Sequence, residues 1–334
     1  MRRNPGHVRF RLARSADLET CRSLLHPGLY LSAAVHRALV DIWRNLMAND
    51  ALTLYVFEDA ALPHPRCIEG FVAGVFVRPD FAQDFLASPR PHLTALIYEA
   101  ILSNRSPVLK LREIARANSG CGLHAVTLHL DFRERDFASP RMAGVLTAAA
   151  ESGRFFRAGY RTNVVFGVLY GNIAHSFRDG GWPVLELSGA TPSTSTTSTA
   201  NDRQPYLVLR RKEEVPSSPL HGHMLFFHAP PPVLGFARAE QRVLERALLE
   251  QSDVAIADEL GISVDAVKKT WRRIFDRVGR VMPCVIPTGN GASDARGCEK
   301  RRHLVHYLRG HLEELRPQAL NSPKRGLLRL TRDC

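Results

Sequence analysis

The sequence predicts a mixed α/β (or α+β) N-terminal domain followed by an all-α, helix-turn-helix C-terminal domain. Over roughly the first 180 residues, segments with the two-residue period of strands alternate with segments of helical period. Residues 188–200 are then dominated by Ser and Thr and carry no apolar period. Beyond them, two short amphipathic helices flank a turn containing Gly261, which indicates a separate helical domain.

Each element of the first domain is expected from the spacing of its apolar residues. Residues 8–13 alternate like a strand, and residues 17–25 follow with the pattern of a helix. Further strands are expected at 52–57, 68–77, 125–131 and 164–170, and further helices at 93–102 and 142–156.

Changes in composition mark the expected domain boundaries. We expect an α/β domain over residues 1–187 and a flexible Ser/Thr- and Pro-rich linker over residues 188–235, with one short strand at 206–210. The helix-turn-helix domain is expected over residues 236–316, and a basic tail over residues 317–334.

Composition and charge narrow the class of protein. The chain has 334 residues, 45% of them hydrophobic, and a net charge of +12. Residues 236–334 hold 19 basic and 13 acidic side chains, which is half of the excess and favours a polyanionic partner. The six cysteines form no Cys-x-x-Cys pair, which argues against a zinc ribbon. Without a signal peptide or a long apolar run, we expect a cytoplasmic protein with no membrane partner.

The helix-turn-helix is predicted from its caps and its apolar stripe. Asp253, or Ser252 before it, can cap the first helix, and Gly261 supplies the positive φ at which that helix ends. Ser263 can accept a hydrogen bond from a free amide of the second helix. The buried stripe of that second helix is expected to consist of Val267, Trp271, Ile274 and Val278.

Cations on the second helix indicate that it binds DNA. They lie off the apolar stripe, so they face solvent or a partner, and Lys268, Lys269 and Arg272 occupy the side that would meet base edges. The opposing interpretation is a solvated helix face or a unit that contacts only proteins. The residues expected to bind DNA are Ser263, Asp265, Lys268, Lys269, Thr270, Arg272, Arg273 and Arg277.

These residues resemble the LuxR-type DNA-binding domain. That family's pattern of Ile-Ala, two residues, Leu-Gly-Ile-Ser and then Val-Lys reads here as residues 256–263 and 267–268. Three positions depart from the family: Glu250 stands near a usual Gly, Ala266 replaces Thr, and Thr270 replaces an aromatic residue or His. The resemblance implies a transcription regulator that binds double-stranded DNA, as a homodimer in many family members.

Shorter pieces of the first domain resemble the GNAT N-acetyltransferase fold. The opening VRFRLARSADL is similar to that family's first strand and helix, and residues 155–161 to its late helix-to-strand segment. In the family, a Gly-rich turn holds the pyrophosphate of acetyl-CoA, and a tyrosine protonates the leaving thiolate. Residues 138–144 lack the Gly spacing, and Phe155 stands at the tyrosine's position, with Tyr160 as the remaining substitute.

We therefore expect a DNA-binding regulator that is not an enzyme. The prediction includes no catalytic residue, no cofactor and no metal ion, and its first domain receives a small-molecule or protein signal. The alternative is a GNAT-type N-acetyltransferase fused to a DNA-targeting domain. The histidines at 221, 223 and 228 are expected to be linker residues rather than metal ligands, because no acidic or thiolate partner accompanies them.

A last amphipathic helix is expected at residues 299–315. Its leucines, at positions 304, 308, 312 and 315, line one face. The stripe is compatible with a dimer contact, as in the LuxR-type domain, and equally with a helix that completes the core of the monomer.

Overall fold

The computed structural model describes residues 8–188, 203–216, 226–227, 229–286 and 293–319, with the backbone alone for 293–298. The chain divides into two compact units. The first comprises Met1–Arg157 and Thr162–Phe227, and the second comprises Ala158–Arg161 and His228–Cys334. Most of the Ser/Thr tract, the histidines at 221, 223 and 228, and residues 320–334 of the basic tail lie outside the described residues.

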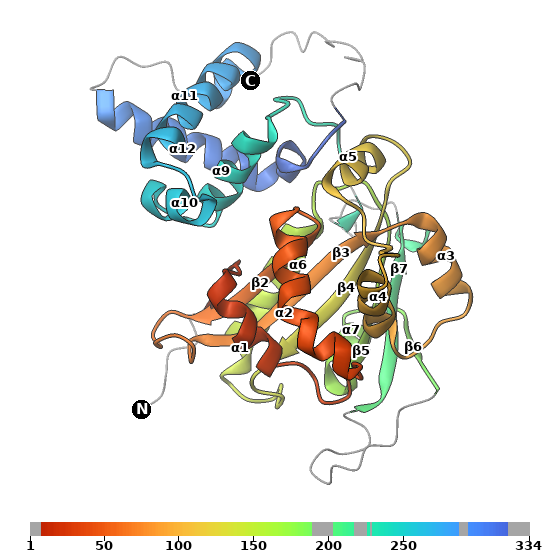
Figure 1. The fold of residues 1–334 in the computed structure, drawn as a ribbon. Helices are drawn as coiled ribbons and strands as arrows, with labels where there is room; N and C mark the ends of the chain where they lie inside the picture. Colours follow the sequence, from red (N-terminus) through yellow and green to blue (C-terminus); the bar gives the residue numbers. More distant parts are fainter. Residues whose placement is uncertain (1–7, 189–202, 217–225, 228, 287–292, 320–334) are drawn as a thin grey trace. The chain divides into compact units, whose positions relative to one another are not determined.

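The first unit is built on one seven-stranded sheet with the order β1-β2-β3-β4-β5-β7-β6 (Figure 1). Neighbouring strands are antiparallel except β4 and β5, which are parallel. A parallel pair needs a crossover connection, and α6 (Met142–Arg157) lies in it. The strands are β1 (Val8–Leu12), β2 (Leu52–Asp59), β3 (Ile68–Val77), β4 (Leu123–Phe132), β5 (Thr162–Tyr170), β6 (Val184–Glu186) and β7 (Pro205–Arg211).

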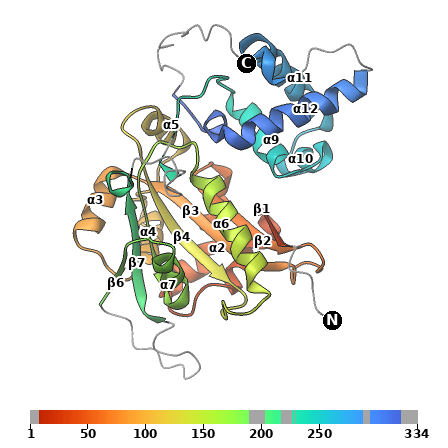
Figure 2. The ribbon, with the colours of Figure 1, turned by 180° about the vertical axis from the view of Figure 1, so that it is seen from behind.

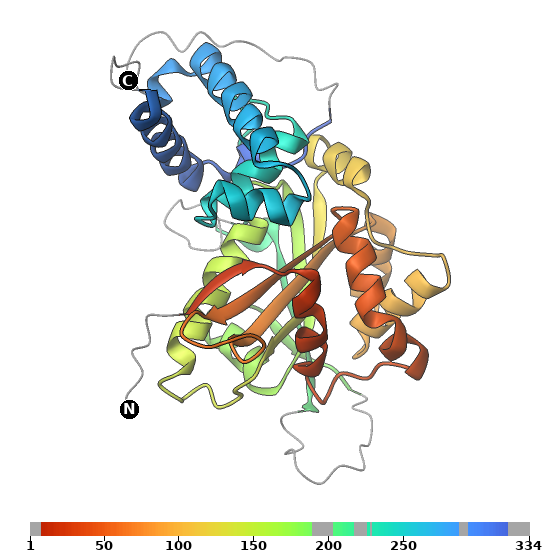
Figure 3. The ribbon, with the colours of Figure 1, turned by 60° about the vertical axis from the view of Figure 1, so that its left-hand side comes forward.

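Helices cover both faces of this sheet. Figures 2 and 3 show α6 on the face opposite α2, and α7 (Gly171–Asp179) lies on the same face as α6. The main core lies under the helices of the other face, where Trp43 and Tyr98 are fully buried. Those helices are α1 (Leu18–Ser23), α2 (Ala33–Ala48), α3 (Pro79–Ala87) and α4 (Leu93–Leu102). The mixed α/β prediction for this part of the chain is confirmed.

All the strands and helices expected from apolar spacing in the first domain are present, but the sequence analysis missed α2, α3, α5 (Leu111–Ser119), α7 and β6. The signal for α2 was available, because Ser32 caps it by accepting the Val35 N–H and its buried side chains recur with helical period. The short strand expected in the linker is β7, which pairs with β5 inside the sheet. No helix among the described residues is long and apolar enough to cross a bilayer.

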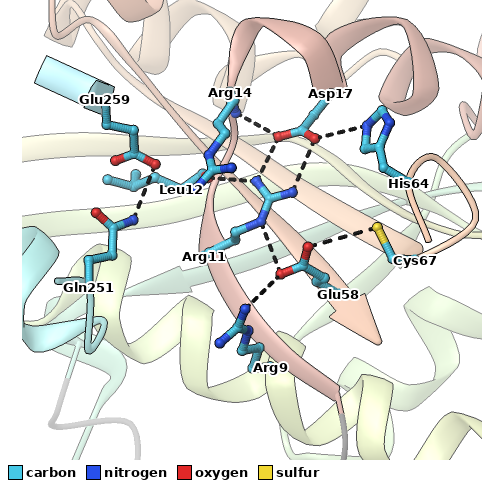
Figure 4. Close-up of polar contacts among 10 residues, drawn as sticks. All are labelled: Arg9, Arg11, Leu12, Arg14, Asp17, Glu58, His64, Cys67, Gln251 and Glu259. Carbon is cyan, nitrogen blue, oxygen red and sulfur yellow. Dashed lines mark hydrogen bonds and ion pairs between the residues drawn. The ribbon is translucent and has the colours of Figure 1, made fainter. Parts of the chain in front are cut away.

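A buried ion network ties the edge strand β1 to the rest of the sheet (Figure 4). The Arg11 guanidinium donates to both carboxylate oxygens of Asp17, at 2.7 and 3.1 Å, and to Glu58 on β2 at 3.1 Å. Asp17 also accepts the backbone N–H of Arg14 at 2.7 Å, and His64 lies 3.3 Å from it. The network fixes the start of α1 next to the first strand pair.

The described elements of the second unit are helical. They are α9 (Arg238–Leu248), α10 (Asp253–Leu260), α11 (Val264–Val281), α12 (Ser293–Gly310) and two 3-10 turns, η5 (Pro283–Val285) and η6 (Leu312–Leu315). The four leucines of the last predicted helix are buried within the chain, although the final two lie in η6 rather than in a continuous helix. Their burial supports a role in the core of the monomer.

Candidate active site

The pairing of β4 with β5 stops before either strand ends. Their last pair is Thr127 with Gly167, although β4 continues to Phe132 and β5 to Tyr170. At the same point the pairing of β4 with β3 is shifted by one residue, so that Leu128 forms a β-bulge. Because of the bulge and the loss of pairing, the backbones at the ends of β4 and β5 do not pair with each other.

Helix α4 holds the bulge in place. Thr94 and Tyr98 are four residues apart and therefore on one face of the helix. The Thr94 hydroxyl donates to the Leu128 carbonyl at 3.0 Å, and the Tyr98 hydroxyl lies 2.7 Å from Nε2 of His129. Both side chains are buried, so these contacts are shielded from water.

A small hollow lies between the two unpaired strand ends. Its interior of about 10 Å³ has room for about one water molecule. Its wall is mostly aliphatic, with four polar residues among those that line it. The lining residues are His26, Leu29, Leu128, His129, Leu130, Asp131, Val168, Leu169, Tyr170 and Ile173.

Tyr170 is the hydroxyl donor of the hollow. It is the last residue of β5, it is 7% exposed, and its ring stacks on His26 with the ring centroids 5.0 Å apart. Nδ1 of His26 accepts the Gly28 N–H at 3.0 Å, which fixes the orientation of this imidazole. Burial, together with the charge of Asp131, raises the pKa of Tyr170 far above its usual value, so the phenol keeps its proton.

Asp131 and His129 provide the charged side of the hollow. They are two residues apart on β4 and therefore point to the same face of the sheet. Oδ2 of Asp131 lies 3.5 Å from Nδ1 of His129, and both residues are at least 95% buried. Burying a carboxylate costs free energy unless it is hydrogen-bonded or paired with a positive charge, and the contact of Asp131 with His129 is long. The site therefore favours a ligand that carries a proton or a positive charge.

The loop between β4 and α6 carries three exposed arginines. Arg133 donates to the backbone carbonyl of Ile68 at 3.0 Å, Arg135 donates to that of Leu25 at 3.5 Å, and Arg141 is paired with the buried Glu69. Residues 138–144, which lack the Gly spacing of a phosphate cradle, form the end of this loop and the first turn of α6. Anion binding there would depend on arginine side chains and the helix N-terminus.

Neither Phe155 nor Tyr160 lines the hollow. The Phe155 ring packs against Phe10 and Tyr55, in a part of the unit that does not line the hollow. Tyr160, the expected substitute, belongs to the second unit. The tyrosine at the hollow is Tyr170, which the sequence analysis placed in a strand without assigning it chemistry. Its one sequence signal is its position at the end of a buried strand, directly before Gly171.

In the second unit, the turn between α10 and α11 has the predicted caps. Ser252 accepts the Ala255 N–H and Ser263 accepts the Ala266 N–H, while Gly261 adopts a left-handed conformation with φ of 64°. The predicted stripe on α11 is buried, with Trp271 5% exposed and its three partners fully buried. Trp271 donates to Asp253 at 3.2 Å and lies under the Arg301 guanidinium, which joins α10, α11 and α12.

The predicted DNA-binding residues divide into two groups by position. Thr270 is buried and its hydroxyl donates to the Ala266 carbonyl, and Arg277 is half-buried and paired with Glu240 at 3.2 Å. Both are therefore engaged inside the unit. The six that remain exposed on or beside α11 are Ser263, Asp265, Lys268, Lys269, Arg272 and Arg273. Among the residues that the structure describes, no cluster of His, Cys, Asp and Glu could hold a metal ion.

Solved structures that resemble this chain include N-acetyltransferases and a GNAT-like decarboxylase. The chain resembles Arabidopsis thaliana NAA60 in complex with acetyl-CoA (14% identity, 62% of this chain and 99% of that one, TM-score 0.37). It also resembles a mutant of the spermidine N-acetyltransferase SpeG from Vibrio cholerae (10%, 61% and 94%, 0.32) and the GNAT-like decarboxylase GphF in complex with isobutyryl-CoA (16%, 61% and 98%, 0.32). Comparison with family models gives no match, and comparison with curated proteins gives none.

The prediction that the chain is not an enzyme was wrong. The similar structures are GNAT-type enzymes over about 60% of the chain, in keeping with the predicted GNAT-like N-terminal part. The prediction rested on a missing proton donor and a missing phosphate cradle. A tyrosine does line the hollow: it is Tyr170, at the end of β5.

Proposed function

We propose that the first unit is an N-acetyltransferase that uses acetyl-CoA, and that the second unit targets it to DNA. The observation that carries this proposal is the hollow between the ends of β4 and β5, which both Tyr170 and Asp131 line. An acid and a base in one small site suit transfer of an acyl group from a thioester to an amine.

The shape of the site fits a short acyl thioester. The facing edges of β4 and β5 beyond Thr127 and Gly167 are not paired with each other, so their amides and carbonyls suit the amide groups of a pantetheine arm. The hollow itself has room for about one water molecule, which argues against acyl chains longer than acetyl. Arg133, Arg135 and Arg141 lie just beyond the end of β4 and would hold the phosphates.

Each polar group has a defined task in this reaction. The amine nitrogen attacks the thioester carbonyl carbon, and the proton that nitrogen loses passes to Asp131. When the carbon–sulfur bond breaks, Tyr170 donates its proton to the leaving thiolate. Because burial and the charge of Asp131 raise the pKa of Tyr170, the phenol keeps its proton at neutral pH until a thiolate forms beside it. A proton returned from Asp131 to Tyr170 through solvent restores the site.

Acetyl transfer by the full chain tests this proposal. Release of coenzyme A would be followed with a thiol reagent, using acetyl-CoA and a panel of polyamines and peptides with free amino termini. Tyr170→Phe removes only the hydroxyl and should lower kcat by about 10²-fold or more. Tyr30→Phe makes the same change at an exposed position and should keep full activity. No turnover on any amine, together with no binding of acetyl-CoA by calorimetry, would reject the proposal.

DNA binding by the second unit is supported by α11. Its predicted stripe is buried, its first turn is capped by Ser263, and Lys268, Lys269 and Arg272 are exposed on the side away from that stripe. A helix of this kind suits the major groove, with Lys268, Lys269 and Arg272 facing base edges and Arg273 nearer the phosphates. Thr270 and Arg277 are left out of this proposal because their side chains are engaged within the unit.

Selection of genomic DNA fragments by the full chain would identify the site and test the proposal. Once a fragment is found, the double variant Lys268→Glu/Arg272→Glu should weaken binding by at least about 30-fold, since each base contact contributes about 1–3 kcal/mol. The control is Arg112→Glu/Arg116→Glu, which makes the same charge change on exposed residues of α5. Equal binding and an equal salt dependence for both double variants would exclude α11 as the DNA-binding helix.

A further inference from the structure

A buried chain of hydrogen-bonding side chains leads from α2 to the hollow. Nε1 of Trp43 donates to the Tyr98 hydroxyl at 2.7 Å, and that hydroxyl lies 2.7 Å from Nε2 of His129. Nδ1 of His129 faces Asp131 at 3.5 Å. Trp43 and Tyr98 have no exposed surface, and His129 and Asp131 are 2% and 5% exposed. Only the last two residues line the hollow.

The positions of the protons along this chain follow from what each atom can donate. An indole nitrogen is a donor only, so the Tyr98 oxygen accepts from Trp43. The Tyr98 hydroxyl then has its own proton to place, and Nε2 of His129 is the acceptor within reach. A neutral imidazole that accepts at Nε2 carries its proton on Nδ1. That proton is on the ring nitrogen nearer the Asp131 carboxylate, with Nδ1 3.5 Å from Oδ2.

The opposite tautomer is disfavoured at both ends of the ring. With the proton on Nε2, the Tyr98 oxygen would accept twice and its own proton would have no acceptor among the contacts found. The Nδ1 lone pair would then face the carboxylate of Asp131 at 3.5 Å, which is repulsive. Because the site is buried, water cannot accept the Tyr98 proton or weaken the repulsion at Asp131.

We propose that Tyr98, aligned by Trp43, is a positioning residue that locks His129 in its Nδ1–H form and so presents a stabilised Asp131 carboxylate to the hollow. Thr94 acts with Tyr98 from the same face of α4, because it holds the carbonyl of the bulge residue next to His129. The consequence for catalysis rests on the proposed acetyl transfer, but the tautomer itself does not.

The locked imidazole would govern the proton donor as well as the base. The negative charge of Asp131 contributes, after burial, to raising the pKa of Tyr170. An imidazole N–H directed at Asp131 favours that charge. Loss of the Tyr98 hydroxyl would free His129 to change tautomer. The change would disturb both groups that exchange protons in the proposed reaction, Asp131 and Tyr170.

Nuclear magnetic resonance of the full chain, with ¹⁵N-labelled histidine, tests the tautomer directly. The His129 signal is assigned by its loss in His129→Gln. We expect a protonated Nδ1 and an unprotonated Nε2 in the unaltered chain, and a mixed or inverted pattern in Tyr98→Phe. Tyr30→Phe, at an exposed tyrosine, should leave the His129 nitrogens unmoved. A protonated Nε2 in the unaltered chain overturns the proposal.

Kinetics separates this proposal from the proposed reaction. In the acetyl-transfer assay, Tyr98→Phe should lower kcat by about tenfold with KM little changed, since it disturbs positioning rather than binding. If His129 is held in its Nδ1–H form but the chain has no transferase activity, the role of Tyr98 in fixing the tautomer is supported and acetyl transfer is rejected. Full activity in a Tyr98→Phe chain whose tautomer has changed would reject the positioning role alone.

Discussion

Arg11 is a buried guanidinium on which the edge of the sheet depends. Its side chain is 11% exposed and donates to two carboxylates that are themselves buried or nearly so. Removing one partner of a buried ion pair destabilises the fold by more than the intact pair stabilises it, because the remaining charge stays buried without its partner. The same reasoning applies to any buried acid in the chain with a single cationic neighbour.

Arg11→Met should therefore destabilise the first unit by about 3–5 kcal/mol. For a unit of this size that corresponds to a fall of about 6–20 °C in the unfolding temperature, measured by differential scanning calorimetry. Arg9→Met is the matched control, because Arg9 also contacts Glu58 but its side chain is 69% exposed. A fall of less than about 2 °C in the Arg11 variant would show that the network contributes little.

The same network predicts how stability depends on pH. Burial raises the pKa of Asp17 and of Glu58, but hydrogen bonds and charge from Arg11 outweigh it, so both values lie below the usual range. The folded chain thus binds these protons less tightly than the unfolded chain does. The stabilisation is complete above about pH 5 and is lost as pH falls through the lower folded values. Arg11→Met should flatten this acid limb; an unchanged limb would assign it to other groups.

Glu250 occupies a backbone position that suits glycine. Its φ is 61°, in the connection between α9 and α10. A left-handed conformation costs a side-chain-bearing residue about 1–2 kcal/mol. Its ion pair with Arg309 is exposed on both sides and contributes little. Glu250→Gly should raise the unfolding temperature of the second unit by a few degrees. Asn104→Gly, at φ of 56° but in a residue type that tolerates it, should give no such gain.

Strand β5 is held close to β4 by a residue without a side chain. A Cβ on Gly167 would lie 2.7 Å from the Thr127 carbonyl oxygen, closer than contact allows. This is the last residue pair before the two strands lose their pairing, so the hollow begins where the closest approach ends. The position of the hollow is thus a property of the strand pair rather than of any one side chain.

Gly167→Ala should destabilise the first unit by about 1–3 kcal/mol and lower acetyl transfer through a displaced strand end. Gly153→Ala on α6 is the matched control. Its Cβ would make only an ordinary contact at 3.7 Å, and a helical Gly to Ala change should stabilise by about 0.5–1 kcal/mol. Equal unfolding temperatures for the two variants, measured by calorimetry, would contradict this account of the strand pair.

Two units with different chemistry make up the whole molecule. The first unit offers a hollow with acid and base groups, and the second offers a capped helix with exposed cations. If the two proposed functions are correct, they can be removed separately. Tyr170→Phe should abolish transfer and leave DNA binding intact, and Lys268→Glu/Arg272→Glu should do the reverse. Loss of both functions in either variant, in a chain that remains folded, would show that one site serves both.

The elements of this protein could be predicted from sequence wherever a local signal specified them. Ser263, Gly261 and the stripe from Val267 to Val278 act within a few residues of one another, so caps and period determined α11. The strands at 68–77 and 164–170 were equally readable from their apolar runs. Helices that were not predicted, such as α2, carry similar local signals.

Which residues line the hollow depends on tertiary structure alone. Tyr170 and Asp131 belong to strands that the chain joins through α6, and they line one hollow only because β4 and β5 pair in parallel and then stop pairing. Tyr98 reaches His129 from a separate helix. Sequence by itself determined which segments would be helix or strand and where the cations of α11 lie, since those depend on short-range spacing. Which hydroxyl faces which carboxylate depends on strand register and a bulge, and these arise only when distant segments pack.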